Sequence, residues 1–198
     1  MYLSAYQGHD DILRLLLAHG GDPNATNVGE DGGWGAPAVY VATEQNHVEA
    51  VKMLLESNGD PNKLRAKDGS GPLYAAADHG SAAIAQLLLR HGADMHAVTR
   101  DTGASPLAMA AHRGNIGVLR VLLEHNVNPD QRSHDDLEET AILMAVGSGN
   151  IECIQLLLEY SADPGIPSKA GVTPLAEATR RGHKAIADLL RKPMPTPI

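Results

Sequence analysis

The chain has 198 residues with 24 acidic and 16 basic side chains, a formal net charge of −8, and 43% hydrophobic residues, which fits one globular unit. Aromatic residues make up 3% of the chain, whereas Ala and Leu together exceed a quarter of it, so we expect helices packed through small side chains rather than a β-sandwich. Neither half carries the excess of basic residues that nucleic-acid binding requires, so we expect no nucleic-acid partner.

Cysteine content and hydropathy indicate the cellular compartment of the protein. Cys153 is the single cysteine, so it forms no internal disulfide, and the chain lacks the cysteine pairs that hold zinc. No apolar run in the sequence approaches the about 18 residues of a membrane-spanning helix, and the N-terminus lacks the pattern of a signal peptide. We therefore expect a cytoplasmic or nuclear protein with no membrane partner.

Along the chain, one short motif recurs at a nearly constant spacing. Its copies read P-A-V-Y-V-A-T-E-Q-N from residue 37, G-P-L-Y-A-A-A-D-H-G from 71, S-P-L-A-M-A-A-H-R-G from 105, T-A-I-L-M-A-V-G-S-G from 140 and T-P-L-A-E-A-T-R-R-G from 173. The second residues of successive copies are 34, 34, 35 and 33 positions apart. A period of this length indicates an array of structural repeats.

Each copy predicts a short helix that is followed by a longer one. Ser105-Pro106 and Thr173-Pro174 are typical of a helix start, and Gly or Asn ends each short helix in a left-handed conformation. The second apolar stretches have the spacing of one helix face, and they begin at residues 12, 50, 84, 118, 153 and 186. Each unit thus reads as helix, turn, longer helix and extended segment.

These motifs resemble the ankyrin-repeat family, whose pattern is T-P-L-x-x-A-A-x-x-G-H-x-x-V-x-x-L-L-x-x-G-A-D. The resemblance implies an all-α repeat fold, a solenoid of about six helix-turn-helix units with β-hairpin finger loops and a concave face. The units span about residues 1–27, 28–65, 66–99, 100–132, 133–167 and 168–192, with a Pro-rich tail at 193–198. The first unit lacks its opening turn and finger, so either the chain belongs to a longer array or this unit is a minimal cap.

Two candidate chemical sites have weak sequence support. The glycine cluster at residues 29–35 includes Glu30 and Asp31, which would repel a phosphate, and it lacks the Lys-Ser/Thr of a phosphate-binding loop. The run His134-Asp135-Asp136 could bind a cation, but adjacent residues on a loop rarely form a closed metal shell. We therefore expect no cofactor and no metal site.

The resemblance implies that binding residues lie in the finger loops and at the ends of the short helices. We expect a monomeric, non-enzymatic interaction module or scaffold that binds a protein partner through these positions. Trp34 is the leading anchor candidate, because Trp is enriched in binding hot spots. The predicted partner-binding residues are Trp34, Glu44, Lys67, Asp78, His79, Asp101, His112, Arg113, Asp136, Arg180 and Arg181.

An alternative interpretation is a small-molecule-binding or catalytic solenoid. Asp78, His79 and His112 lie on adjacent repeats, with Tyr74 one helical turn earlier, and together they could form an acid–base cluster in the groove. A deep pocket lined by these side chains would favour this alternative. An open groove would favour the interaction module.

Overall fold

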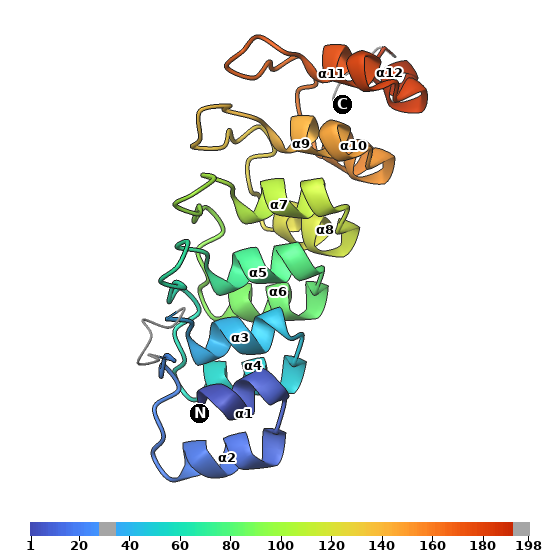
Figure 1. The fold of residues 1–198 in the computed structure, drawn as a ribbon. Coiled ribbons are helices and arrows are strands. Elements are labelled where there is room, and N and C mark those ends of the chain that lie inside the picture. The colour runs from blue at the N-terminus through green and yellow to red at the C-terminus, as the bar shows by residue number, and fades with distance from the viewer. Residues whose placement is uncertain (28–34, 192–198) are drawn as a thin grey trace.

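The computed structural model describes residues 1–27 and 35–191, which form twelve helices stacked as consecutive pairs (Figure 1). In each pair a first helix is joined to a second by a tight turn, and an extended loop leads to the next pair. The helices are α1 (Tyr2–Gln7), α2 (Asp10–Ala18), α3 (Ala38–Glu44), α4 (Val48–Glu56), α5 (Pro72–His79), α6 (Ala82–Arg90), α7 (Pro106–Arg113), α8 (Ile116–Glu124), α9 (Ala141–Ser148), α10 (Ile151–Glu159), α11 (Pro174–Arg181) and α12 (Lys184–Leu190).

The local start and stop signals in the sequence account for the helix boundaries. Ser105 Oγ accepts a hydrogen bond from the backbone N–H of Ala108 at 3.2 Å, and Thr173 Oγ1 accepts one from Ala176 at 3.3 Å. These side chains satisfy backbone donors that the first helical turn leaves unpaired. Gly114, directly after α7, has φ 76°, in the left-handed region that favours glycine. The predicted caps are thus confirmed at these helices.

Two kinds of side chain build the core and set the curvature of the stack. The first helices bury small residues such as Ala76 and Ala110, whereas the second helices bury larger ones such as Leu88 and Leu122. Consequently, the first helices pack more closely on one another than the second helices do. Because the first helices lie closer together, we expect the stack to curve toward them, with the first helices on its concave side.

Polar side chains between the pairs fix the stacking register. Asn62 Oδ1 accepts a hydrogen bond from the backbone N–H of Asp94 at 2.7 Å, and its Nδ2 donates to the carbonyl of Gly92 at 2.9 Å. Asn24 makes the equivalent pair of bonds to the loop after α4. These bonds satisfy loop backbone groups that the helices leave unpaired.

The described parts of the loops that connect the pairs project to the same side of the stack (Figure 1). Within the described ranges, their β structure consists of isolated antiparallel bridges between Thr26 and Pro37 and between Arg132 and Thr140. The expected β-hairpin geometry of the fingers is therefore not confirmed. The predicted anchor Trp34 and the Pro-rich tail at 193–198 lie outside the described residues. No helix in the described part of the chain is long and apolar enough to cross a bilayer.

Candidate partner-binding face

The finger loops, which we define as residues 65–70, 99–104, 133–139 and 168–172, are closed by short hydrogen-bonded turns. In the first, the backbone N–H of Arg65 donates to the carbonyl of Ser70 at 2.9 Å. The hydroxyl and the N–H of Ser70 both donate to Asp68 Oδ1, at 2.6 and 3.0 Å. Asx-type hydrogen bonds of this kind fix a turn without a long ladder of backbone hydrogen bonds between two strands.

Successive finger loops are linked to each other through the backbone. Arg100 N–H donates to the carbonyl of Asp68 at 2.8 Å, and Lys169 N–H donates to that of Leu137 at 2.9 Å. Between these, the N–H of His134 donates to the carbonyl of Gly103 at 3.0 Å. Gly103 has φ 58°, and a Cβ there would lie 2.5 Å from the backbone carbon of His134, so only glycine fits this contact. The fingers thus form one connected row.

An ion-pair network connects the first described finger to the helix behind it. Arg65 forms a two-pronged pair with Asp68, lies 3.4 Å from Glu44 Oε1, and stacks over the Tyr40 ring at 4.8 Å. Burial alone would raise the pKa of the Asp68 carboxyl, but the hydrogen bonds from Arg65 and Ser70 outweigh it and hold the pKa well below its usual range. Asp68 therefore stays ionised and keeps Arg65 in place.

The C-terminal ends of the first helices are held by asparagines from the neighbouring pair. Asn115 Nδ2 donates to the carbonyls of Ala77 and Asp78, at 2.6 and 3.1 Å. Asn150 repeats the arrangement one pair later, with bonds to the carbonyls of Ala111 and His112. These bonds pair carbonyls that a helix end leaves free, so they hold the helix ends at fixed positions.

Charged side chains on these helix ends pair across and within the repeats. Arg113 Nε donates to Asp78 Oδ1 of the preceding pair at 2.6 Å. Arg180 and Arg181 both bind Glu177, and Arg181 also donates to the carbonyl of Gly147. Hydrogen bonds from the two arginines lower the pKa of Glu177 to about 2. The face therefore presents oriented ion pairs.

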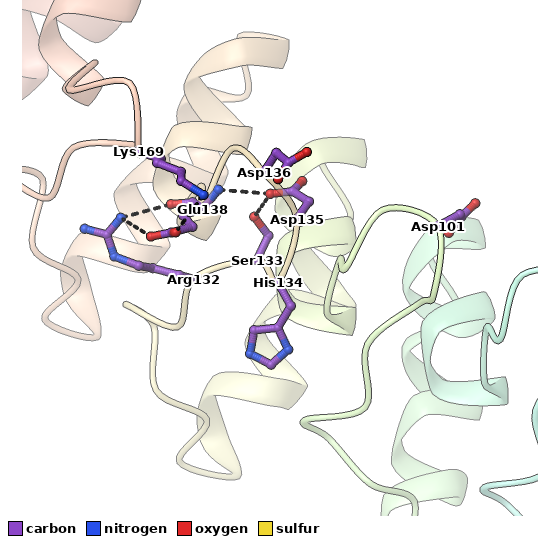
Figure 2. Close-up of a pocket in the computed structure, with 8 residues that line it drawn as sticks. All are labelled: Asp101, Arg132, Ser133, His134, Asp135, Asp136, Glu138 and Lys169. Atoms are coloured by element: carbon purple, nitrogen blue, oxygen red, sulfur yellow. Dashed lines mark hydrogen bonds and ion pairs between the residues drawn. The ribbon is translucent and has the colours of Figure 1, made fainter.

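An open hollow of about 750 Å³ lies between the later fingers (Figure 2). Glu138 lines the hollow, and its carboxylate lies 3.5 Å from Lys169 Nζ and 3.8 Å from Arg132 Nη1. Asp135 Oδ1 accepts hydrogen bonds from Ser133 Oγ and from two backbone N–H groups, so this carboxylate closes its own loop. Among residues 1–27 and 35–191, no cluster of side chains has the composition of a metal site. The hollow is thus a polar, solvent-open depression.

The proposed acid–base cluster does not assemble in the structure. Asp78 is held by Arg113, and His79 Nε2 lies 3.9 Å from Asp78 Oδ2, beyond hydrogen-bonding distance. Burial first, and then the charges of Asp78 and Asp101, raise the pKa of Tyr74 to about 12, so its phenol is protonated at neutral pH. His112 is exposed at a helix end. The catalytic alternative therefore has no structural support.

Most of the predicted binding residues lie on one side of the stack. Glu44, Asp78, His79, His112, Arg113, Arg180 and Arg181 occupy the ends of first helices, and Lys67, Asp101 and Asp136 lie on finger loops. Together we call these residues the concave face. Trp34, the leading anchor candidate, lies outside the described residues.

Sequence reasoning missed the residues that hold this face together. Asn115 and Asn150 follow the glycine that ends a first helix, where the family pattern has His, and they lie 35 residues apart. The recurrence of Asn at equivalent positions of two repeats was the sequence signal that could have identified them. Arg65 and Tyr40 gave no comparable signal, because their contact depends on side-chain conformations and not on spacing.

Comparison with known protein families gives a match over nearly the whole chain. The family model described as ankyrin repeats (3 copies) matches residues 1–99, 39–133, 73–166 and 127–195. No individual curated protein matches the chain.

Proposed function

Because the chain belongs to the ankyrin-repeat family, we propose that it is a non-enzymatic interaction module that binds a protein partner through its concave face and finger loops. Proteins of this family are generally protein–protein interaction modules. We take each helix pair with its loop as one repeat, which gives six repeats over residues 1–192. Trp34 and the finger loops would add contacts beside the helix ends.

One observation carries the proposal: the finger loops and helix ends are fixed by hydrogen bonds between neighbouring pairs. The backbone bond from Arg100 to Asp68 and the side-chain bonds from Asn115 and Asn150 hold these groups before any partner arrives. A face that is already ordered loses little conformational entropy on binding. An ordered, open face of this kind favours the binding of a protein surface, either folded or extended.

The charge pattern of the face suits a polar partner surface. Asp101 and His112 are exposed and lie in the same repeat, and Arg113 is also exposed although it is paired with Asp78. Polar groups of this kind contribute to orientation and specificity more than to total affinity. The proposed partner is therefore a protein with complementary charged groups, and its identity is to be found by experiment.

The proposal is tested by affinity capture from cells of the source organism, with the captured proteins quantified by mass spectrometry. Arg113→Ala removes a guanidinium from the concave face, and the loss of its exposed ion pair should cost less than about 1 kcal/mol of stability. We expect this variant and Trp34→Ala to capture the specific partner at a markedly reduced level, with a thermal midpoint close to that of the wild type.

A matched control is available in the same helix pair. Arg120 lies on α8, the second helix, and is also exposed, so Arg120→Ala removes the same group from the opposite side of the repeat. We expect Arg120→Ala to capture the partner like the wild type. If both concave variants capture it normally, or if Arg120→Ala alone abolishes capture, the assignment of the face is wrong.

A further inference from the structure

Two tyrosines occupy equivalent positions on the neighbouring first helices α3 and α5. Tyr40 is the third residue of α3, and Tyr74 is the third residue of α5. Each tyrosine is followed four residues later by an acid, Glu44 in α3 and Asp78 in α5. Residues four apart lie on the same side of a helix. The chain thus carries the same combination, an aromatic ring beside a carboxylate, in two consecutive repeats.

In the first of these repeats, the chain fills the site with a guanidinium of its own. Arg65, the first residue of its finger loop, stacks over the Tyr40 ring at 4.8 Å. The same guanidinium pairs with Glu44 at 3.4 Å and with Asp68. A guanidinium is planar, so it can lie on an aromatic face while its N–H groups donate to carboxylates. Tyr40 is 3% exposed, so this site is closed.

In the next repeat, the equivalent site lacks this guanidinium. Thr99 takes the place of Arg65 as the first residue of its finger loop, and its hydroxyl lies 2.7 Å from that of Thr102. An uncharged threonine is too short to cover a neighbouring ring as an arginine does. No arginine of residues 1–27 or 35–191 stacks on the Tyr74 ring, and Tyr74 is half-buried. The second site is therefore open.

Two neighbouring arginines are held by contacts away from the Tyr74 ring. Arg113 Nε donates to Asp78 Oδ1 at 2.6 Å, so this guanidinium pairs with the acid and does not cover the ring. Arg100 packs on the preceding finger loop, where a Cβ on Gly69 would lie 2.6 Å from the Arg100 Cγ. Neither arginine therefore closes the site over Tyr74 in the way that Arg65 closes the first site.

The open site has a negative charge beside its aromatic ring. The carboxylates of Asp68 and Asp78 are paired with arginines, but Asp101 has no ion-pair partner in the described part of the chain. Burial first, and then the charges of these three carboxylates, raise the pKa of Tyr74 to about 12, so all three act on the phenol. One unpaired carboxylate next to an aromatic ring suits a single planar cation.

We propose that the open site between Tyr74 and Asp101 receives the guanidinium of an arginine side chain of the protein partner. The guanidinium lies on the Tyr74 ring, as that of Arg65 lies on Tyr40, and donates to the Asp101 carboxylate. Lysine fits less well, because an ammonium group cannot stack on a ring as a plane. This inference rests on the proposed function, since it names a side chain with which the partner engages the concave face.

The peptide acetyl-Gly-Ser-Arg-Ser-Gly-amide is the probe, titrated into the isotope-labelled full chain and followed by NMR chemical shifts. We expect saturable shifts at the amides of α5 and of the finger loop 99–104, with a dissociation constant on the order of 1 mM, because a single side chain supplies the contact. A peptide with citrulline in place of arginine keeps the planar shape without the charge, and it should bind about fivefold more weakly or less. The lysine peptide should also bind more weakly than the arginine peptide.

Variants of the chain separate the contributions of the ring and the acid. Asp101→Asn changes an exposed residue and should weaken binding of the arginine peptide about threefold. Tyr74→Leu removes the ring and should weaken it about fivefold, whereas Tyr74→Phe keeps the ring and should bind nearly as the wild type does. Glu124→Gln is the matched control, because it removes an exposed acid from α8, on the other side of the stack. It should bind the peptide like the wild type.

Three results would overturn the arginine site: no saturable shifts, equal binding of the arginine and citrulline peptides, or wild-type binding by both Asp101→Asn and Tyr74→Leu. Partner capture that falls with Arg113→Ala but not with Asp101→Asn or Tyr74→Leu would also overturn the site, while it would support the concave face as the binding surface. Capture that none of the concave-face variants reduces would instead overturn the proposed function. In that case, peptide binding that depends on Tyr74 and Asp101 would still support the site.

Discussion

Leu122→Ala tests whether α8 packs in the register described above. The Leu122 side chain is fully buried, as are Leu54, Leu88 and Leu157 at the equivalent positions of other repeats. Replacing Leu by Ala removes three carbon atoms, which at about 0.8 kcal/mol each corresponds to a transfer term of about 2.4 kcal/mol. The cavity left behind raises the cost, and such substitutions generally fall at about 2–5 kcal/mol.

Because each helix pair contacts only its neighbours, this loss is concentrated in the middle of the stack. Urea unfolding followed by circular dichroism should show a lower midpoint, and the thermal midpoint should fall by several degrees. Leu137→Ala is the control, since its side chain is 54% exposed and its removal should change stability by less than about 0.5 kcal/mol. If Leu122→Ala unfolds at the same urea concentration as the wild type, the register of α8 is wrong.

Three further predictions follow from individual contacts. Asn62→Ala removes two hydrogen bonds between neighbouring pairs and should lower the free energy of unfolding by about 1–2 kcal/mol. The control Asn128→Ala loses one bond within its own loop and should lower this free energy by less. Equal urea midpoints for the two variants would contradict this prediction. Glu177 has a pKa of about 2 in the folded chain against 4.5 ordinarily, so its stabilising contribution is present above pH 4.5 and is lost as the pH falls toward 2. Between these pH values, the free energy of unfolding of Glu177→Gln should therefore fall less steeply than that of the wild type. An equally steep fall in the variant would refute the role of the arginine pair. Burial raises the pKa of the Cys153 thiol to about 11, so a thiol reagent at pH 7.5 should label it slowly in buffer and faster in urea. Labelling in buffer at the rate of a free thiol would contradict the burial of Cys153.

The helices could be predicted from the sequence because their signals are local. Pro106 after Ser105 and Gly114 eight residues later mark both ends of α7, and the structure places the helix between them. The spacing of Leu119 and Leu122 on α8 likewise indicates the face that is buried. Local dihedral preference and periodic burial act on residues that are close in sequence, so a pattern is enough to show them.

The candidate site was predicted only in outline. The positions of Asp78 and Arg113 on the concave face followed from the repeat register, but their ion pair did not. That contact joins residues 35 positions apart and depends on the conformation of a long side chain. The row of finger loops was missed for a similar reason, because backbone bonds such as Arg100 to Asp68 require the three-dimensional distance between two loops.

The central claim, that a protein partner binds the concave face and finger loops, is tested most directly by hydrogen–deuterium exchange of the protein with and without its captured partner. The account predicts slower exchange in the complex at the finger-loop amides of Arg100 and His134 and at the C-terminal ends of α5 and α7. Exchange in α8 and α10, on the opposite side of the stack, should be unchanged. Protection confined to the second helices, with none at the finger loops, would contradict the account.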